Sequence, residues 1–433
     1  MVANSSSKQK ASVLQYVYQV RSSDAFVLVA MCFAMFTDTF IYGMIVPILP
    51  YLLLQGGEMS DDDVQKWTSI LLATYGAAIL IGSRMVSDRI QSRRSPLLIG
   101  FVTIALSTSF FLFARSPVVL VLARFFQGLS GAIIGVLGLA MIADTAPPDK
   151  VGGYMAVGSL SFAWGMLSGP AIGGALFDKL GIFGAFGVPI MMLVIDIILR
   201  ILIIEKKDGK EQPQSQPDEE APLLRHESSQ ESLSLKNFFH PRLMTAVIME
   251  VIVSSILTGF ETTLPLFTRE TYGWSSTGAG LVFLPLTIPS FLSIPLSKHA
   301  RRYGCRKVVA IELILSFFPI VALRFTEPDS PHNQILFMAL LTLIGFFMTT
   351  AQAFVMTEVS DAIREIEVLL GVQSGKSSGM GTGYAFCNMA MATGQFIGPV
   401  LAGSTKLGLG WGMMAFILGG INCAVGLLSL VLV

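Results

Sequence analysis

The sequence is poor in charge. Only 13% of its 433 residues are Asp, Glu, Lys or Arg, whereas 53% are hydrophobic, and the mean hydropathy is +0.67. Soluble globular domains carry about 25% charged residues, so this composition excludes that class. The 29 basic and 29 acidic residues balance to a formal charge of zero, and no long basic tract is present. The sequence therefore gives no electrostatic reason to expect a nucleic acid as a partner.

Cysteine is also scarce. The four cysteines, Cys32, Cys305, Cys387 and Cys423, are scattered along the chain, and three of them lie within apolar runs. This spacing predicts neither a disulfide framework nor a metal site, and we expect no metal and no cofactor. The first 25 residues are polar and lack the apolar core and cleavage site of a signal peptide. The first apolar run is therefore expected to direct its own insertion into the membrane.

Long apolar runs dominate the rest of the chain. A membrane helix needs about 20 consecutive apolar residues, and stretches of this kind recur from residue 26 onwards. We therefore predict an all-α membrane protein with about twelve transmembrane helices. The predicted spans are residues 26–54, 67–87, 96–114, 117–144, 152–177, 182–204, 243–268, 277–297, 307–325, 333–358, 379–405 and 409–433.

The same pattern of small residues and proline occurs twice inside these runs, at a constant offset. The two copies are Gly165-x-x-x-Gly169-Pro170-x-x-Gly173-Gly174 and Gly394-x-x-x-Gly398-Pro399-x-x-Ala402-Gly403. Small residues let membrane helices approach closely, so each copy predicts a helix-packing face. The repeat indicates two related halves. Duplicated helix bundles that rock about a shared midplane site are typical of secondary transporters.

One long hydrophilic segment, residues 205–240, separates six predicted spans from the other six. It is rich in Glu, Gln, Ser, Pro and Lys, which predicts a disordered linker because it cannot bury enough apolar surface to offset the loss of chain entropy. The predicted organisation is a terminal segment at 1–25, a six-helix bundle at 26–204, this linker, and a second, pseudo-symmetric six-helix bundle at 241–433.

Basic residues in the short loops predict the orientation. They cluster after the second and eighth spans, whereas the loops on the opposite side carry a single basic residue each. Because cytoplasmic loops are enriched in Lys and Arg, both termini are predicted to be cytoplasmic. The two clusters are Arg84, Arg89, Arg93 and Arg94, and Lys298, Arg301, Arg302, Arg306 and Lys307.

A short stretch of the linker matches an acidic dileucine sorting signal: Glu219-Glu220-Ala221-Pro222-Leu223-Leu224. The pattern is degenerate, so a sorting adaptor as partner and a chance match are both open. If it is a signal, replacing Leu223 and Leu224 by Ala should move a fluorescent fusion from vacuolar or vesicular membranes to the plasma membrane, because a receptor can bind a peptide in a flexible segment. An unchanged distribution at equal abundance would dismiss the signal.

Several polar residues lie deep in apolar spans. An ionisable residue in such a position is by default a functional-site candidate, although Asp38 could also be capped by the hydroxyl groups of Thr37 and Thr39. Aromatic residues in the same spans are candidates for binding an amphipathic or cationic molecule, with packing in the core or against lipid as the alternative. The candidates for the cavity are Asp38, Tyr42, Arg124, Gln127, Glu261, Gln352 and Asn388, with the aromatic residues Trp164, Phe260 and Tyr384; Glu250 and Glu312 are left without a role.

These residues carry a resemblance to the major facilitator superfamily over nearly the whole chain. Asp38 with Pro47-x-x-Pro50, Arg124-x-x-Gln127-Gly128 and the first glycine-proline pattern resemble motifs of helices one, four and five of twelve-span drug:proton antiporters. Glu261-Thr262-Thr263-Leu264-Pro265-Leu266 and Tyr384-Ala385-Phe386-Cys387-Asn388 are most similar to the vesicular amine transporter-like branch and its fungal relatives. The chain departs from the family pattern at the gate motifs, where Arg84 and Arg301 replace a glycine and an aspartate, and at Asn388, where the amine transporters carry an acid.

The resemblance implies a transporter and not an enzyme: a monomer that works by alternating access around a cleft lined by helices one, four, seven and ten. We expect proton-coupled antiport of a small cationic or amphipathic molecule out of the cytosol, with Asp38 and Glu261 as the proton-coupling carboxylates. Asp88 and Arg89 would hold the cytoplasmic gate, and the two glycine faces would join helices of opposite halves. A non-transporting sensor or interaction protein of the same fold, and a facilitator without proton coupling, are the alternatives.

Overall fold

The computed structural model describes residues 18–55, 59–87, 94–114, 116–147, 150–203, 240–326, 330–369 and 378–431, together with residues 15 and 57. Within these ranges the secondary structure is helical and contains no strand. The predicted gate residues Asp88 and Arg89 lie outside the described residues. So do most of the predicted linker and the sorting residues Glu219, Leu223 and Leu224.

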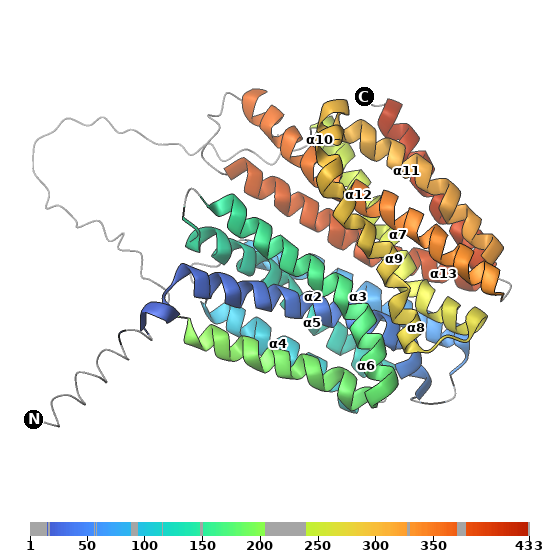
Figure 1. Ribbon diagram of the computed structural model, residues 1–433, viewed down its shortest axis with the longest axis horizontal. Helices are drawn as coiled ribbons and strands as arrows, with labels where there is room; N and C mark the ends of the chain where they lie inside the picture. The colour runs from blue at the N-terminus through green and yellow to red at the C-terminus, as the bar shows by residue number, and fades with distance from the viewer. Residues whose placement is uncertain are drawn as a thin grey trace, which may run out of the picture.

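The first half begins with long helices that follow the predicted spans: α2 (Asp24–Gln55), α3 (Asp61–Ser87), α4 (Arg94–Phe113), α5 (Pro117–Thr145) and α6 (Val151–Leu202). Helix α6 has 52 residues, about 78 Å at 1.5 Å per residue, which is more than twice the apolar thickness of a bilayer. Gly181 interrupts it with a φ of 65° and a ψ of −164°, a conformation that glycine adopts without steric cost. Figure 1 shows the two parts of α6 as two green helices that meet near the bottom of the view, right of its centre.

The second half repeats this arrangement. Its elements are α7 (Pro241–Tyr272), α8 (Ser276–Leu281), α9 (Phe283–Thr287), the 3₁₀ helix η2 (Ile288–Leu292), α10 (Ser293–Tyr303), α11 (Cys305–Ala322), the 3₁₀ helix η3 (Leu323–Thr326), α12 (Pro331–Leu369) and α13 (Ser378–Val431). Helix α13 is interrupted at Gly410, whose φ is 80°, as α6 is at Gly181. The repeat predicted from the glycine-proline patterns thus extends to the position of the turn that follows each pattern.

Ten described helical segments are long and apolar enough to cross a membrane. Counting α6 and α13 as two crossings each gives the predicted twelve. The eighth crossing is not the single helix expected at 277–297, because α8, α9, η2 and α10 follow one another there. Pro285, Pro289 and Pro295 lie in this stretch, and each removes a backbone donor from the helix.

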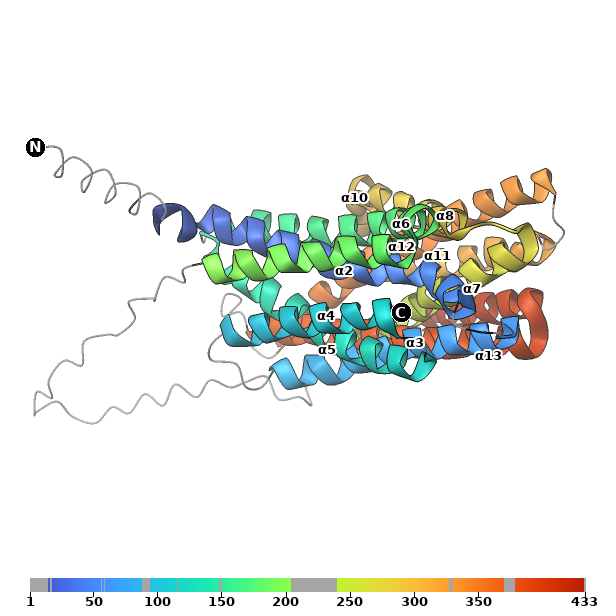
Figure 2. The same ribbon diagram turned by 90° about the horizontal axis from the view of Figure 1, so that it is seen from below.

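The two halves meet at one end of the molecule, which we call the closed end; it contains the helix ends at Gln55, Asp61 and Tyr272 (Figures 1 and 2). Side chains and backbone of opposite halves bond to each other there. The pairs are Tyr51 Oη to Trp274 O at 2.7 Å, Gln65 Nε2 to Thr262 O at 3.2 Å, Arg269 to Asp61 at 2.8 Å, Lys406 Nζ to Gln65 Oε1 at 3.2 Å, and Ser275 and Thr277 to Asp178 at 2.9 and 2.7 Å. An exposed ion pair contributes at most about 1 kcal/mol. The closure therefore depends on the whole set of contacts and not on any single one.

The glycine faces pack differently from the prediction. A Cβ added at Gly169 would lie 2.7 Å from the carbonyl oxygen of Phe40 in α2, and Gly165 and Gly173 contact the same helix. Gly394 and Gly398 likewise contact α7. Helix α2 belongs to the same half as the first three glycines, and α7 belongs to the same half as Gly394 and Gly398. For these five glycines, the expectation that the glycine faces join opposite halves is wrong. Pro170 also packs its ring near Gly43 of α2, and Pro399 is buried.

The last glycine of each pattern is the one that crosses between the halves. Gly174 lies against the backbone of Ser276 in α8, and Gly403 lies against Ser69 of α3. Gly280 of α8 in turn meets the carbonyl group of Pro170. Gly165, Gly169 and Gly173 are spaced by four residues and therefore share one face of the helix. Gly174 follows Gly173 directly and is rotated from that face by about 100°, so it meets a different helix. One pattern thus provides two packing faces.

Candidate substrate and proton site

A cavity of about 530 Å³ lies between the halves, within the size range of sites for drug-sized molecules. Its walls come from α2, α3, α5 and α6 of the first half and from α7, α9, η2, α12 and α13 of the second. They include the predicted helices one, four, seven and ten, which are α2, α5, α7 and α12. Ser159, Phe162, Ala353 and Met356 line the cavity on the parts of α6 and α12 farther from the closed end, and they are exposed. The cavity therefore opens toward the end opposite the closed end.

The charge of the lining has one sign. Asp38, Glu250 and Glu261 are among the lining residues, and no Lys, Arg or His is found among the described residues that form the wall. Most of the remaining surface is apolar, with Phe162, Phe283 and several aliphatic side chains. Such a lining favours a molecule that combines apolar groups with a positive charge.

A hydrogen bond joins the two halves at the wall of the cavity. The Tyr42 hydroxyl of α2 donates to Oε2 of Glu261 in α7 at 2.5 Å. The ring of Tyr42 lies 4.7 Å from the ring of Tyr75 in α3, measured between centroids. The Arg124 guanidinium of α5 lies 5.4 Å from the Tyr42 ring centroid and 4.5 Å from that of Tyr75. A carboxylate, two aromatic rings and a cation thus form one cluster.

Arg124 lies behind the two tyrosines. It is fully buried and donates to Gln127 Oε1 at 3.3 Å, and Gln127 donates to Thr108 Oγ1 at 3.0 Å. Neither Arg124 nor Gln127 belongs to the lining of the cavity. The structure therefore does not place at the wall the two residues that were predicted to contact substrate, and the guanidinium of Arg124 lies beside the Tyr42 ring.

Asp38 lies near the hydroxyl group of Tyr75. Gly131 of α5 makes room for it, because a Cβ added there would lie 3.4 Å from Asp38 Oδ1 and 3.0 Å from the Tyr75 hydroxyl oxygen. Asp38 Oδ1 is buried without a hydrogen-bond partner among the described residues. Thr37 and Thr39 donate to the backbone carbonyl groups of Phe33 and Met35. The alternative that their hydroxyl groups cap Asp38 is therefore wrong.

Replacing Tyr42 by Phe isolates the hydroxyl group from the ring. The variant keeps the stack on Tyr75 and the contact with Arg124 but loses the bond to Glu261. Because hydrogen bonds to charged groups contribute about 1.5–3 kcal/mol, we expect flux driven by a pH gradient to fall by about tenfold or more and the melting temperature to fall slightly. Tyr42→Leu, which also removes the ring, should lower the melting temperature further. Full flux in Tyr42→Phe would show that this bond has no part in transport.

The other predicted contacts divide into three groups. Gln352 of α12 and Asn388 of α13 line the cavity, as expected. Trp164 does not: its side chain is 48% exposed and its ring lies 5.9 Å from that of Phe291. Phe260 is fully buried in the core, and Tyr384 lies in α13 in a stretch whose side chains are not described.

Several lining residues, among them Tyr75 and Gln395, were missed by the sequence reasoning, and Glu250 was left without a role. Tyr75 and Gln395 line the cavity, and Gln395 Oε1 is buried without a partner among the described residues. Both are polar residues inside apolar spans, the signal that identified Asp38. Glu250, which had no predicted role, also lines the cavity, whereas Glu312 is outside the described lining.

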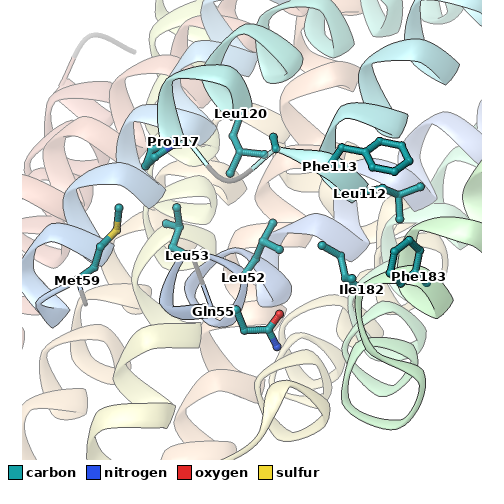
Figure 3. Close-up of a pocket in the computed structure, with 11 residues that line it drawn as sticks. Leu52, Leu53, Gln55, Met59, Leu112, Phe113, Pro117, Leu120, Ile182 and Phe183 are labelled. Atoms are coloured by element: carbon teal, nitrogen blue, oxygen red, sulfur yellow. The ribbon is translucent and has the colours of Figure 1, made fainter. Parts of the chain in front are cut away.

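A second cavity, of about 460 Å³, lies within the first half near the closed end (Figure 3). Apart from Gln55, the side chains that form it are apolar, and leucine and phenylalanine side chains such as Leu52, Leu120 and Phe183 surround it. It contains no ionisable side chain among the residues that form it. The side chains that form it include none that titrates, so the cavity between the halves is the better candidate for a proton site.

Comparisons with known proteins agree with this arrangement. The sequence model described as Major Facilitator Superfamily matches residues 31–377. An uncharacterised MFS-type transporter, C18.02, from Schizosaccharomyces pombe is 28% identical over 403 residues, which cover 88% of this chain and 90% of the relative. A probable vesicular acetylcholine transporter-B from Danio rerio is 25% identical over 418 residues, covering 91% of this chain and 76% of the relative. Among solved structures, the nucleoside transporter NupG superposes with a TM-score of 0.70 at 13% identity, covering 94% of this chain and 98% of NupG.

Proposed function

The chain belongs to the Major Facilitator Superfamily, and we propose that it is a proton-coupled antiporter that moves a small cationic or amphipathic organic molecule out of the cytosol. The observation that carries the proposal is the bond from Tyr42 to Glu261, which links a carboxylate of one half to the other half at the cavity. Protonation of Glu261 changes this contact between the halves. Proton binding and the relative position of the halves are therefore coupled.

Asp38 and Glu261 are the proposed proton carriers, one in each half. Burial disfavours the charged form of a carboxylate, and access to water or to a cation favours it. A carboxylate at the wall of a cavity that opens to alternate sides therefore gains and loses its proton during the cycle. Alternating access by rocking of the two bundles is the expected motion for this architecture.

The charge of the cavity supports a cationic substrate. Its lining contains three carboxyl groups and, among the described residues, no basic side chain. The similarity to a vesicular acetylcholine transporter points in the same direction, since acetylcholine carries a quaternary ammonium group. By the predicted orientation, the closed end faces away from the cytosol and the cavity opens to the cytosol, where the substrate would enter. Whether the membrane is vesicular, vacuolar or plasma membrane follows from the sorting test.

The proposal is tested with the purified full chain in lipid vesicles that contain a pH-sensitive dye. A panel of quaternary ammonium and pyridinium cations is added, because these molecules carry no proton across the bilayer by themselves. A cation that elicits proton movement only in vesicles containing the protein, and that accumulates against its gradient when a pH gradient is imposed, supports antiport. Cation flux that is independent of the pH gradient would identify a facilitator. Absence of flux across the panel would favour a sensor or interaction protein.

A further inference from the structure

We propose that Glu250, with Gln352 and Ser254, forms a separate subsite for the positively charged group of the transported molecule. The inference rests on the proposed function, because it takes the cavity to be the transport site. It assigns the charge of the substrate and the proton to different carboxylates, with the proton at Asp38 and Glu261.

The position of Glu250 shows a carboxylate with unused bonding capacity at the cavity wall. Glu250 lies on α7 and is 2% exposed. Its Oε1 accepts hydrogen bonds from Ser254 Oγ at 3.2 Å and from Gln352 Nε2 at 3.4 Å. Its Oε2 is buried without a hydrogen-bond partner among the described residues. Both donors are neutral, and a buried carboxylate without a counter-charge is unfavourable until a cation arrives.

The charges around the two acidic sites of α7 differ. Glu261 has Tyr42 as donor and the Arg124 guanidinium beside the same tyrosine. Glu250 has two neutral donors, and the described wall of the cavity contains no basic residue. A ligand cation would therefore gain more at Glu250 than at Glu261, where the protein already supplies positive charge.

The two acids also occupy different depths. Glu250, Ser254, Thr258 and Glu261 all line the cavity, at a spacing that places them along one face of α7. Glu250 lies 11 residues before Glu261, about 16 Å along the helix axis, toward the open end. A molecule that enters from the open end reaches Glu250 first, while Glu261 remains bonded to Tyr42.

The rest of the wall suits the apolar part of such a molecule. Phe283 and Phe291 from the α9 and η2 segments, and Met356 from α12, line the same cavity. Aromatic faces attract organic cations, and methionine side chains adapt to ligands of different shape. The amides of Gln352 and Asn388 add donors and acceptors without adding charge. The subsite therefore fits an aromatic or amphipathic monovalent cation.

The test measures equilibrium binding of two ions of matched shape and opposite charge, tetraphenylphosphonium and tetraphenylborate, to the purified full chain in detergent. Glu250→Gln should weaken tetraphenylphosphonium binding by about tenfold or more and leave tetraphenylborate binding unchanged or stronger. The matched control is Glu312→Gln, because Glu312 is a buried acid of the same half that bonds to Thr350 at 2.8 Å outside the described lining. This control should bind tetraphenylphosphonium within about twofold of the unmodified chain.

Three results would overturn the subsite: no tetraphenylphosphonium binding by the unmodified chain, equal affinity in Glu250→Gln, or an equal loss in Glu312→Gln. A second variant covers the case in which Glu250→Gln is unstable. Gln352→Lys keeps Glu250 but places a positive charge beside it, so tetraphenylphosphonium binding should fall by about tenfold or more while tetraphenylborate binding does not, and unchanged tetraphenylphosphonium affinity would also contradict the subsite. Flux driven by a pH gradient, measured on the same variants, separates this proposal from proton coupling, because either can fail while the other holds.

Discussion

Uptake driven by a pH gradient should be abolished by Glu261→Gln, by Asp38→Asn, or by both. Each substitution keeps the shape of the side chain and most of its hydrogen-bonding capacity, including an acceptor for the Tyr42 hydroxyl at position 261, but removes the group that binds and releases a proton. Without that group the proton gradient cannot be converted into movement of the halves. Counterflow exchange, which needs no net proton movement, should remain measurable in the affected variant, and the amount of protein in the membrane should be unchanged.

The control for this prediction is Glu312→Gln, which removes a buried carboxyl group of the second half that is not in the described lining of the cavity. It should retain flux driven by a pH gradient. Loss of expression in both Asp38→Asn and Glu261→Gln would indicate that the two acids support the fold. Flux with the normal pH dependence in both variants would show that proton coupling, if present, uses other residues.

Gly280→Leu should prevent the closed end from closing and should stop transport. A Cβ at this position would overlap the carbonyl group of Pro170 in the opposite half, and backbone atoms cannot rotate away. Overpacking of this kind typically costs about 1–3 kcal/mol, enough to shift a balanced equilibrium by about tenfold in favour of the state in which the halves are apart. Spin labels at Ser60 and Ser404, which are exposed near the closed end in opposite halves, should move farther apart in this variant.

Three other glycines provide comparisons for this experiment. Gly187→Leu is the matched control, because a Cβ there has no neighbour within 4 Å, and it should keep the label distance and the flux of the unmodified chain. Gly169→Leu and Gly398→Leu press against α2 and α7 of their own halves, so they should lower thermal stability and transport without opening the closed end selectively. An unchanged label distance and full flux in Gly280→Leu would show that the backbone contact does not control closure.

The sequence by itself determined the number of membrane crossings, the division into two halves, and several residues of the cavity. These features depend on local properties: the length of an apolar run sets how many times the chain can cross, and a polar residue deep in such a run is expected to face the protein interior. Asp38, Tyr42, Glu261, Gln352 and Asn388 were identified in this way, and all five line the cavity. The turn at Gly181 lies in the break between two predicted spans, and the turn at Gly410 lies within two residues of such a break.

Only the tertiary structure decided which of these residues act together. Tyr42 and Glu261 are 219 positions apart, and their bond depends on the rotation and axial offset of α2 against α7. A difference of one residue changes the face of a helix by about 100°, which is why Arg124 lies behind the tyrosines and why Gly174, but not Gly173, crosses to the other half. Helix rotation is set by packing against neighbouring helices, and periodicity within one span contains no information about it.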